Sequence, residues 1–120
     1  MVLIDTSVWV EHFRKGEIRL GALLNDSRVS CHPFIVGELA CGNFRNRSEI
    51  LSFLGTLPMA ISAEHEEVMR FIEKYHLMGK GLGYIDIHLL AAAVLSDIPL
   101  WTFDGKLDKA CSSMGISYRP

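Results

Sequence analysis

Residues 1–10 have the sequence MVLIDTSVWV, a short apolar run that meets a carboxylate and then begins a helix-like pattern. An apolar run of this length, bounded by polar residues, is typical of a buried β-strand. Thr6 or Ser7 is expected to cap the following helix by accepting hydrogen bonds from its first free N–H groups. In open α/β sheets the ligand crevice lies outside the carboxyl ends of the strands. Asp5 is therefore a candidate site residue, and its alternative role is that of an ordinary turn or cap residue.

Strand-like and helix-like segments alternate along the rest of the chain. Further strands are expected over 28–31, 100–103 and 115–118, with a brief extended segment over 58–61. Helices are expected from Val8 to near Lys15, over 18–24, from Pro33 to Gly42, over 50–57, from a capping box near Ser62 to Tyr75, over 84–95 and over 106–114. This alternation favours an α/β fold with a parallel or mostly parallel sheet and helices on both faces. No linker or repeat interrupts it, so we expect one domain over 1–120.

Composition excludes several classes of protein. The net charge of −2 provides no overall basic field of the kind that attracts nucleic acid. The three cysteines form no CxxC pair, which argues against a disulfide framework or a zinc site and favours a reducing cytoplasm. No signal peptide is visible, and no apolar run reaches the ~18 residues that span a bilayer.

Four acidic residues occupy special positions: Asp5, Glu38, Asp86 and Asp104. Asp5 and Asp104 directly follow strand-like runs, and parallel strands would present both at one edge of the sheet. Asp86 lies in the first turn of an apolar helix, where anions are favoured, and Glu38 lies inside another apolar helix. Converging carboxylates without a basic cluster need a cation as counter-charge, and oxygen ligands select Mg²⁺ or Mn²⁺. The pattern predicts a site where such an ion activates water and clamps a phosphoryl group.

Each acid also has a structural interpretation. Glu38 could pair with Arg45 or Arg47, Asp86 could serve its own helix end, and Asp104 before a glycine could form a turn. Asp108 lies four residues beyond Asp104 and is the alternative candidate for the fourth acid of the site. The hydroxyl residues Thr6, Ser7 and Thr102 either orient the carboxylates or simply cap and form strands.

The ordered set of LIDTS (3–7), IVGEL (35–39), YIDIHLLAA (84–92) and TFD (102–104) resembles the PIN-domain ribonucleases. The resemblance covers essentially the whole chain and is strongest to the VapC toxins of toxin–antitoxin pairs. It implies a three-layer α/β/α sandwich with a central, mostly parallel sheet, and an acidic site of Asp5, Glu38, Asp86 and Asp104. Gly105 departs from the second acid and aromatic that many relatives have in this corner, which places Asp104 below the other three.

The resemblance further implies a cytoplasmic, metal-dependent endoribonuclease that forms a homodimer and is inhibited by a VapB-like antitoxin. Asp5, Asp86 and Asp104 would hold Mg²⁺ or Mn²⁺, and Glu38 would ligate the ion or position the attacking water. The RNA substrate could be tRNA, rRNA or mRNA. Trp9, Phe13 and Phe44 are candidates for the antitoxin-binding surface, with core packing as their alternative.

Charge supports an RNA substrate more than the total suggests, since the net charge of −2 becomes +2 once the four acids are set aside. Basic residues flank the acidic segments and could contact phosphates: Arg14, Lys15, Arg45, Arg47, Lys80, Lys106 and Lys109. Two other functions compete with the nuclease. One is a PIN module that binds metal, RNA or protein without turnover. The other is a phosphate-accepting receiver domain, disfavoured because no acid pair precedes Asp5.

Overall fold

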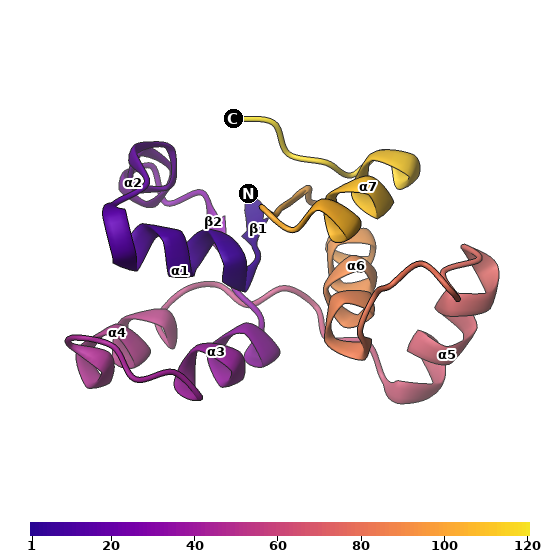
Figure 1. Ribbon diagram of the computed structural model, residues 1–120, viewed down its shortest axis with the longest axis horizontal. Helices are drawn as coiled ribbons and strands as arrows, with labels where there is room; N and C mark the ends of the chain where they lie inside the picture. The colour runs from indigo at the N-terminus through magenta and orange to yellow at the C-terminus, as the bar shows by residue number, and fades with distance from the viewer.

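The computed structural model describes residues 1–120, and a short parallel sheet lies at its centre (Figure 1). The strands β1 (Val2–Ile4), β2 (Val29–Ser30) and β3 (Leu100–Trp101) are arranged in the order β2-β1-β3. Leu3 is opposite Ser30 on one side and Leu100 on the other. All three residues of β1 are fully buried, because both neighbours and the flanking helices cover this central strand. The parallel register brings the carboxyl ends of β1 and β3 to the same edge.

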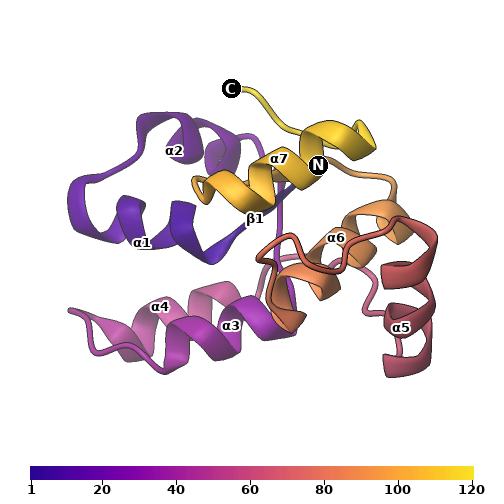
Figure 2. The same cartoon turned by 45° about the vertical axis from the view of Figure 1, so that its right-hand side comes forward.

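Helices flank the sheet on both sides, which gives the expected three-layer α/β/α arrangement. Figure 1 shows α1–α4 on one side of the strands and α5–α7 on the other, and in the turned view of Figure 2 α7 passes in front of β1. The helices are α1 (Thr6–Lys15), α2 (Ile18–Asn25), α3 (Pro33–Ala40), α4 (Arg47–Leu54), α5 (His65–Lys74), α6 (Tyr84–Ser96) and α7 (Gly105–Met114). No helix has both the length and the hydrophobicity that crossing a membrane requires.

The α6 helix supplies much of the core because seven consecutive residues, 87–93, are buried. Three of them are the small residues Ala91, Ala92 and Ala93, which let neighbouring elements approach the helix closely. Its outer side packs against α5, whose Val68 is fully buried. The position of α6 is therefore fixed from both sides, and so is the position of its first turn, which carries Asp86.

The structure corrects several of the expected element ends. Asp5 itself caps α1, whereas Thr6 and Ser7 were the expected caps. The capping box of α5 is formed by Glu64 and Glu67 and not near Ser62, because the chain stays extended through Ala63 before it turns. The fourth helix spans Arg47–Leu54 and so begins and ends three residues early, with Gly55 at its C-terminus.

The expected fourth strand at 115–118 is reduced to one parallel bridge between Leu100 and Ser117. Two backbone hydrogen bonds hold the segment there, from Leu100 N to Ile116 O and from Tyr118 N to Leu100 O. Since β3 itself has only two residues, it offers too short an edge for a longer ladder. The chain end therefore covers β3 without extending the sheet by a full strand.

Candidate active site

Asp5 is buried at the carboxyl end of β1 and held through one of its two carboxylate oxygens. Its Oδ2 accepts hydrogen bonds from Ser7 Oγ at 2.7 Å, Thr102 Oγ1 at 2.8 Å and the Ser7 backbone N–H at 3.4 Å. Oδ1 makes no hydrogen bond to the protein, and only 6% of the residue surface is exposed. The capping role and the site role are compatible, because the cap uses one oxygen and leaves the other available.

Thr102 joins the ends of β1 and β3. Besides donating to Asp5, its hydroxyl lies 3.2 Å from Ser7 Oγ and accepts a hydrogen bond from the Asp104 N–H at 3.0 Å. Ser7 Oγ in turn accepts from the Phe103 N–H at 3.0 Å. The hydroxyls of Ser7 and Thr102 therefore orient the Asp5 carboxylate, as the sequence suggested, and they also fix the turn that leads to Asp104.

The pKa of Asp86 is raised above its ordinary value, and the neighbouring acids contribute to this shift. Partial burial raises its pKa, the Gly83 N–H that donates to its Oδ2 at 2.9 Å lowers it, and the charges of Asp5 and Asp104 raise it further. Asp5 and Asp104 lie at the same end of the sheet, where Thr102 bonds to both of them. Their charges act on Asp86, which indicates that the first turn of α6 lies near this end. Repulsion between like charges favours protonation of one member of such a group.

Asp104 also caps a helix, since its Oδ1 accepts from the N–H groups of Lys106 and Leu107 at 2.9 and 3.0 Å. The competing acid Asp108 forms an ion pair with Arg119 at 2.6 Å. Asp108 is absent from the groups that shift the pKa of Asp86, whereas Asp104 is one of them. Asp108 is thus neutralised by its own partner, whereas the charge of Asp104 acts on Asp86.

Glu38 of α3 is linked by a hydrogen bond to Thr6, the residue that follows Asp5. The Thr6 hydroxyl donates to Glu38 Oε1 at 2.7 Å, and both residues line a cavity of about 360 Å³ between α1 and α3. Glu38 forms no ion pair with Arg45 or Arg47. Arg47 donates instead to backbone carbonyls at the end of α3, including that of Ala40 at 2.6 Å. The structural alternative for Glu38 is therefore wrong.

The four acids suit a hard cation by their chemistry, because all four offer oxygen and none forms an ion pair with Lys, Arg or His. No three His, Cys, Asp or Glu side chains are grouped closely enough to enclose one ion. Mg²⁺ usually keeps several waters and takes one or two carboxylates, so it does not require a closed cage. The free Oδ1 of Asp5, beside the raised-pKa Asp86, is the feature that fits such an ion.

A buried histidine pair beside the site is not apparent from the sequence, where the histidines look scattered. His32 and His88 lie with ring centroids 6.4 Å apart, and neither ring nitrogen of His88 has a hydrogen-bond partner. Burial, with a smaller effect of His88, lowers the pKa of His32 to about 4; burial and then the charge of His65 lower the pKa of His88. Both are neutral at neutral pH and add no positive charge to balance the acids.

Replacement of Thr102 by valine tests the hydroxyl network. Thr102→Val keeps the shape of the side chain but removes the donor to Asp5 and the acceptor for the Asp104 N–H. We expect urea unfolding to show a loss of about 1–3 kcal/mol, because buried partners lose their hydrogen bonds. RNA cleavage, the activity that the sequence resemblance implies, should fall about tenfold, since a residue that orients a metal ligand typically contributes this much. Thr56→Val is the matched control, because Thr56 is exposed and bonds only to the Phe53 carbonyl. Equal activity of the two variants would contradict the positioning role.

Comparison with known proteins assigns the family. The PIN domain family model matches residues 2–112. The chain is 40% identical over 118 residues to Ribonuclease VapC32 from two strains of Mycobacterium tuberculosis, covering 98% of this chain and 95% of each relative. Its fold is similar to the crystal structure of PAE2754 from Pyrobaculum aerophilum, with a TM-score of 0.66 at 16% identity, covering 91% of this chain and 83% of that one. The expected α/β/α sandwich is confirmed, and the chain belongs to the PIN domain family.

Proposed function

We propose that this protein is the toxin of a type II toxin–antitoxin pair and acts as a metal-dependent endoribonuclease. The observation that carries the proposal is the pair Asp5 and Asp104, joined through Thr102 at the carboxyl edge of the sheet, whose charges raise the pKa of Asp86. None of the three acids has a basic partner. The 40% identity to a ribonuclease over nearly the whole chain supports the substrate class. Nucleases of this family in general require a divalent metal, and we propose Mg²⁺ with Mn²⁺ as a substitute.

In the proposed reaction Asp5, Asp86 and Asp104 hold the ion, directly or through water. The bound ion would lower the pKa of the attacking water and offset the charge that develops on the phosphate. The Thr6 hydroxyl fixes Oε1 of Glu38, which leaves Oε2 to ligate the ion or to accept a hydrogen bond from the attacking water. Thr102 and Ser7 hold Asp5 in one orientation, so its free oxygen is placed before the substrate arrives.

We also propose the partners that accompany such toxins: an RNA substrate among tRNA, rRNA and mRNA, a VapB-like antitoxin and a second copy of the chain. Of the three aromatics expected at the antitoxin surface, Trp9 is buried, with 1% of its surface exposed. Phe13 and Phe44 stack with ring centroids 5.2 Å apart and line two neighbouring surface cavities. Phe13 and Phe44 therefore support the proposal that the antitoxin binds in the groove that also contains Glu38.

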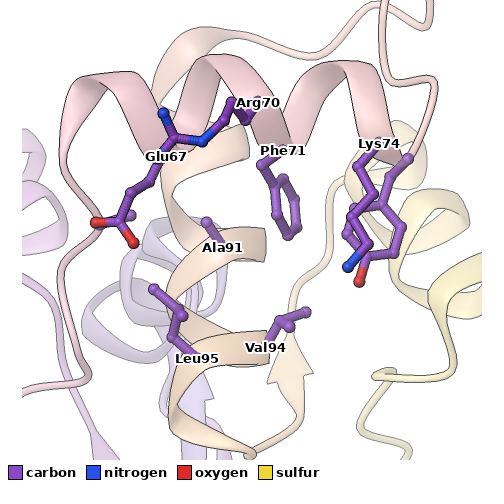
Figure 3. A pocket seen from close by; sticks show the side chains of 9 residues that line it. Glu67, Arg70, Phe71, Lys74, Ala91, Val94 and Leu95 are labelled. Carbon is purple, nitrogen blue, oxygen red and sulfur yellow. The ribbon is translucent and has the colours of Figure 1, made fainter.

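Homodimerisation is supported by exposed apolar surface. A groove of about 390 Å³ lies between α5 and α6. Figure 3 shows Phe71, Ala91, Val94 and Leu95 along it and Glu67 and Arg70 at one end. Leu95 is 45% exposed in the single chain. An apolar groove of this kind is typical of surfaces that contact another protein.

The direct test incubates purified protein with total cellular RNA in Mg²⁺ and in EDTA, and sequences the newly formed RNA ends. We expect defined internal cuts with Mg²⁺ and none with EDTA. Expression of the chain alone should arrest growth, and Asp86→Asn should relieve the arrest. A non-catalytic binding module predicts the opposite: RNA or partner binding without new ends, and growth effects that survive the Asp86→Asn substitution.

A further inference from the structure

Three lysines gather around a cavity that lies beside the acidic site without containing any of its acids. The cavity has a volume of about 390 Å³. We call it the lysine pocket, and its lining residues are Gly79, Lys80, Lys106, Lys109, Ala110 and Ser113. One wall is the loop between α5 and α6, and the other is the side of α7 that carries Lys106, Lys109, Ala110 and Ser113. The lysines of the two walls are separate in the sequence and come together only in the fold.

The positive charge of the lysine pocket is not neutralised by the protein. None of the three lysines forms an ion pair. The nearest acids along the chain are committed elsewhere: Asp108 pairs with Arg119, and Asp104 Oδ1 accepts from two backbone N–H groups of α7. Ammonium groups that share a cavity repel one another unless an anion lies between them. The pocket therefore favours a bound anion.

The loop wall is shaped to receive one of these lysines. Gly81 has a φ of +74°, a conformation in which a side chain is strained. A Cβ atom at this position would lie 2.8 Å from Lys106 Cδ and 2.9 Å from its Nζ. The Lys106 side chain therefore lies against the Gly81 backbone, in the space that a Cβ atom would occupy. Gly79, with a φ of +71°, provides a second left-handed turn in the same wall.

Both walls of the lysine pocket continue directly into the acidic site. The loop leads to Gly83, whose N–H donates to Asp86 Oδ2 at 2.9 Å. The α7 wall begins at Asp104, whose charge raises the pKa of Asp86. We propose that the lysine pocket binds a backbone phosphate of the RNA that neighbours the phosphate being cut. The assignment rests on the proposed nuclease function and adds to it a second, non-catalytic phosphate site.

The chemistry of the lining favours a phosphodiester over other anions. Lysine acts as a compact point charge with three donors and is a common phosphate ligand, whereas paired carboxylate recognition more often uses arginine. No aromatic side chain lines the pocket, so it offers no surface for stacking a base. It would contact the sugar–phosphate backbone and contribute affinity and register without reading the sequence.

Binding measured without cleavage tests the assignment first. A labelled single-stranded RNA of mixed sequence is titrated in EDTA with the wild type, with the triple variant Lys80→Gln, Lys106→Gln, Lys109→Gln, and with Arg28→Gln. Arg28 is the control because it is exposed and directly precedes β2, at the amino end of the sheet and away from the carboxyl edge that carries the acids. We expect the triple variant to bind about tenfold more weakly, the effect of losing one charged contact. Its log–log salt slope should fall by about 0.7, the value for one single-strand phosphate.

Cleavage separates positioning from catalysis. The triple variant should show a KM about tenfold higher at an unchanged kcat, because the contact is made equally before and during the reaction. The change should vanish with a dinucleotide, which has only the scissile phosphate. Lys106→Arg, which keeps the charge, should retain most of the wild-type affinity. Wild-type affinity and KM in the triple variant would overturn the proposal, and so would an equal loss with the dinucleotide.

The outcome also distinguishes this proposal from the nuclease assignment. If no RNA is cut in Mg²⁺ by any form of the protein, the nuclease function fails, while RNA binding in EDTA still decides the pocket. Titration of the wild type and the triple variant with inorganic phosphate shows whether the pocket binds a free anion in place of RNA. Phosphate binding that is lost in the triple variant, with RNA affinity unchanged, would assign the pocket to a free anion and overturn the RNA contact.

Discussion

RNA cleavage by the Asp5→Asn protein is expected to fall by about 10²–10³-fold, the range for losing one charged group that stabilises the transition state. Asparagine has nearly the same volume and keeps one carbonyl oxygen, which can accept the hydrogen bonds of Ser7 and Thr102 that now reach Oδ2. The amide nitrogen then replaces the free Oδ1, and a donor stands where an anionic ligand is required. Rates at saturating Mg²⁺, with the end products sequenced, measure the effect.

The loss of cleavage by Asp5→Asn can be interpreted only if the variant is folded. Because the side chain also caps α1, the variant should be compared with wild type by thermal unfolding and by circular dichroism. An asparagine cap is about as good as an aspartate cap, so α1 should remain intact. Full cleavage by a folded variant would show that the activity arises from another site or from contamination.

Asp86→Asn should make the protein more stable while it removes cleavage. The amide that replaces the carboxylate retains an acceptor for the Gly83 N–H but carries no charge to repel Asp5 and Asp104. In the absence of metal we therefore expect a Tm above that of wild type at neutral pH, together with a loss of cleavage of about 10²–10³-fold. Calorimetry in EDTA and the cleavage assay in Mg²⁺ measure the two effects on the same preparation.

The pH dependence of this stability gain follows from the direction of the Asp86 pKa. Partial burial, with the charges of Asp5 and Asp104 adding to it, raises the pKa above its ordinary 3.8, so the folded state binds this proton more tightly than the unfolded state. Its contribution to stability is fully present below 3.8 and is lost as the pH rises through the folded pKa. The difference in Tm between Asp86→Asn and wild type should therefore be larger at neutral pH than in mild acid.

Adding Mg²⁺ should make wild type more stable than Asp86→Asn, the reverse of the order expected in EDTA. The proposed Mg²⁺ would bind the folded acids and stabilise wild type by mass action, whereas Asp86→Asn would lack one proposed ligand and should gain less. A Tm of wild type that does not respond to Mg²⁺, or a variant that is less stable than wild type in EDTA, would contradict a shared cation site at Asp5, Asp86 and Asp104.

Much of the site was predictable because its signals are local. The position of Asp5 after an apolar strand, of Asp86 in the first turn of an apolar helix, and of Asp104 before α7 can each be recognised within a few residues. Strand and helix patterns likewise depend on neighbours in the sequence, which is why the alternating α/β order was predicted. The errors occurred at element ends such as the α5 cap, where several nearby residues are chemically able to cap and packing selects one.

The sequence by itself determined the set of acids, their order along the chain and their attachment to strand ends and helix starts. Only the tertiary structure decided which acids interact: Asp108 pairs with Arg119, while the charge of Asp104 raises the pKa of Asp86. It also decided that Asp5 leaves one oxygen free, and that lysines from a loop and from α7 meet across one pocket. The physical reason is distance. Capping and periodicity act between near neighbours in the chain, whereas charge pairing and repulsion act between side chains that only the packed core brings together.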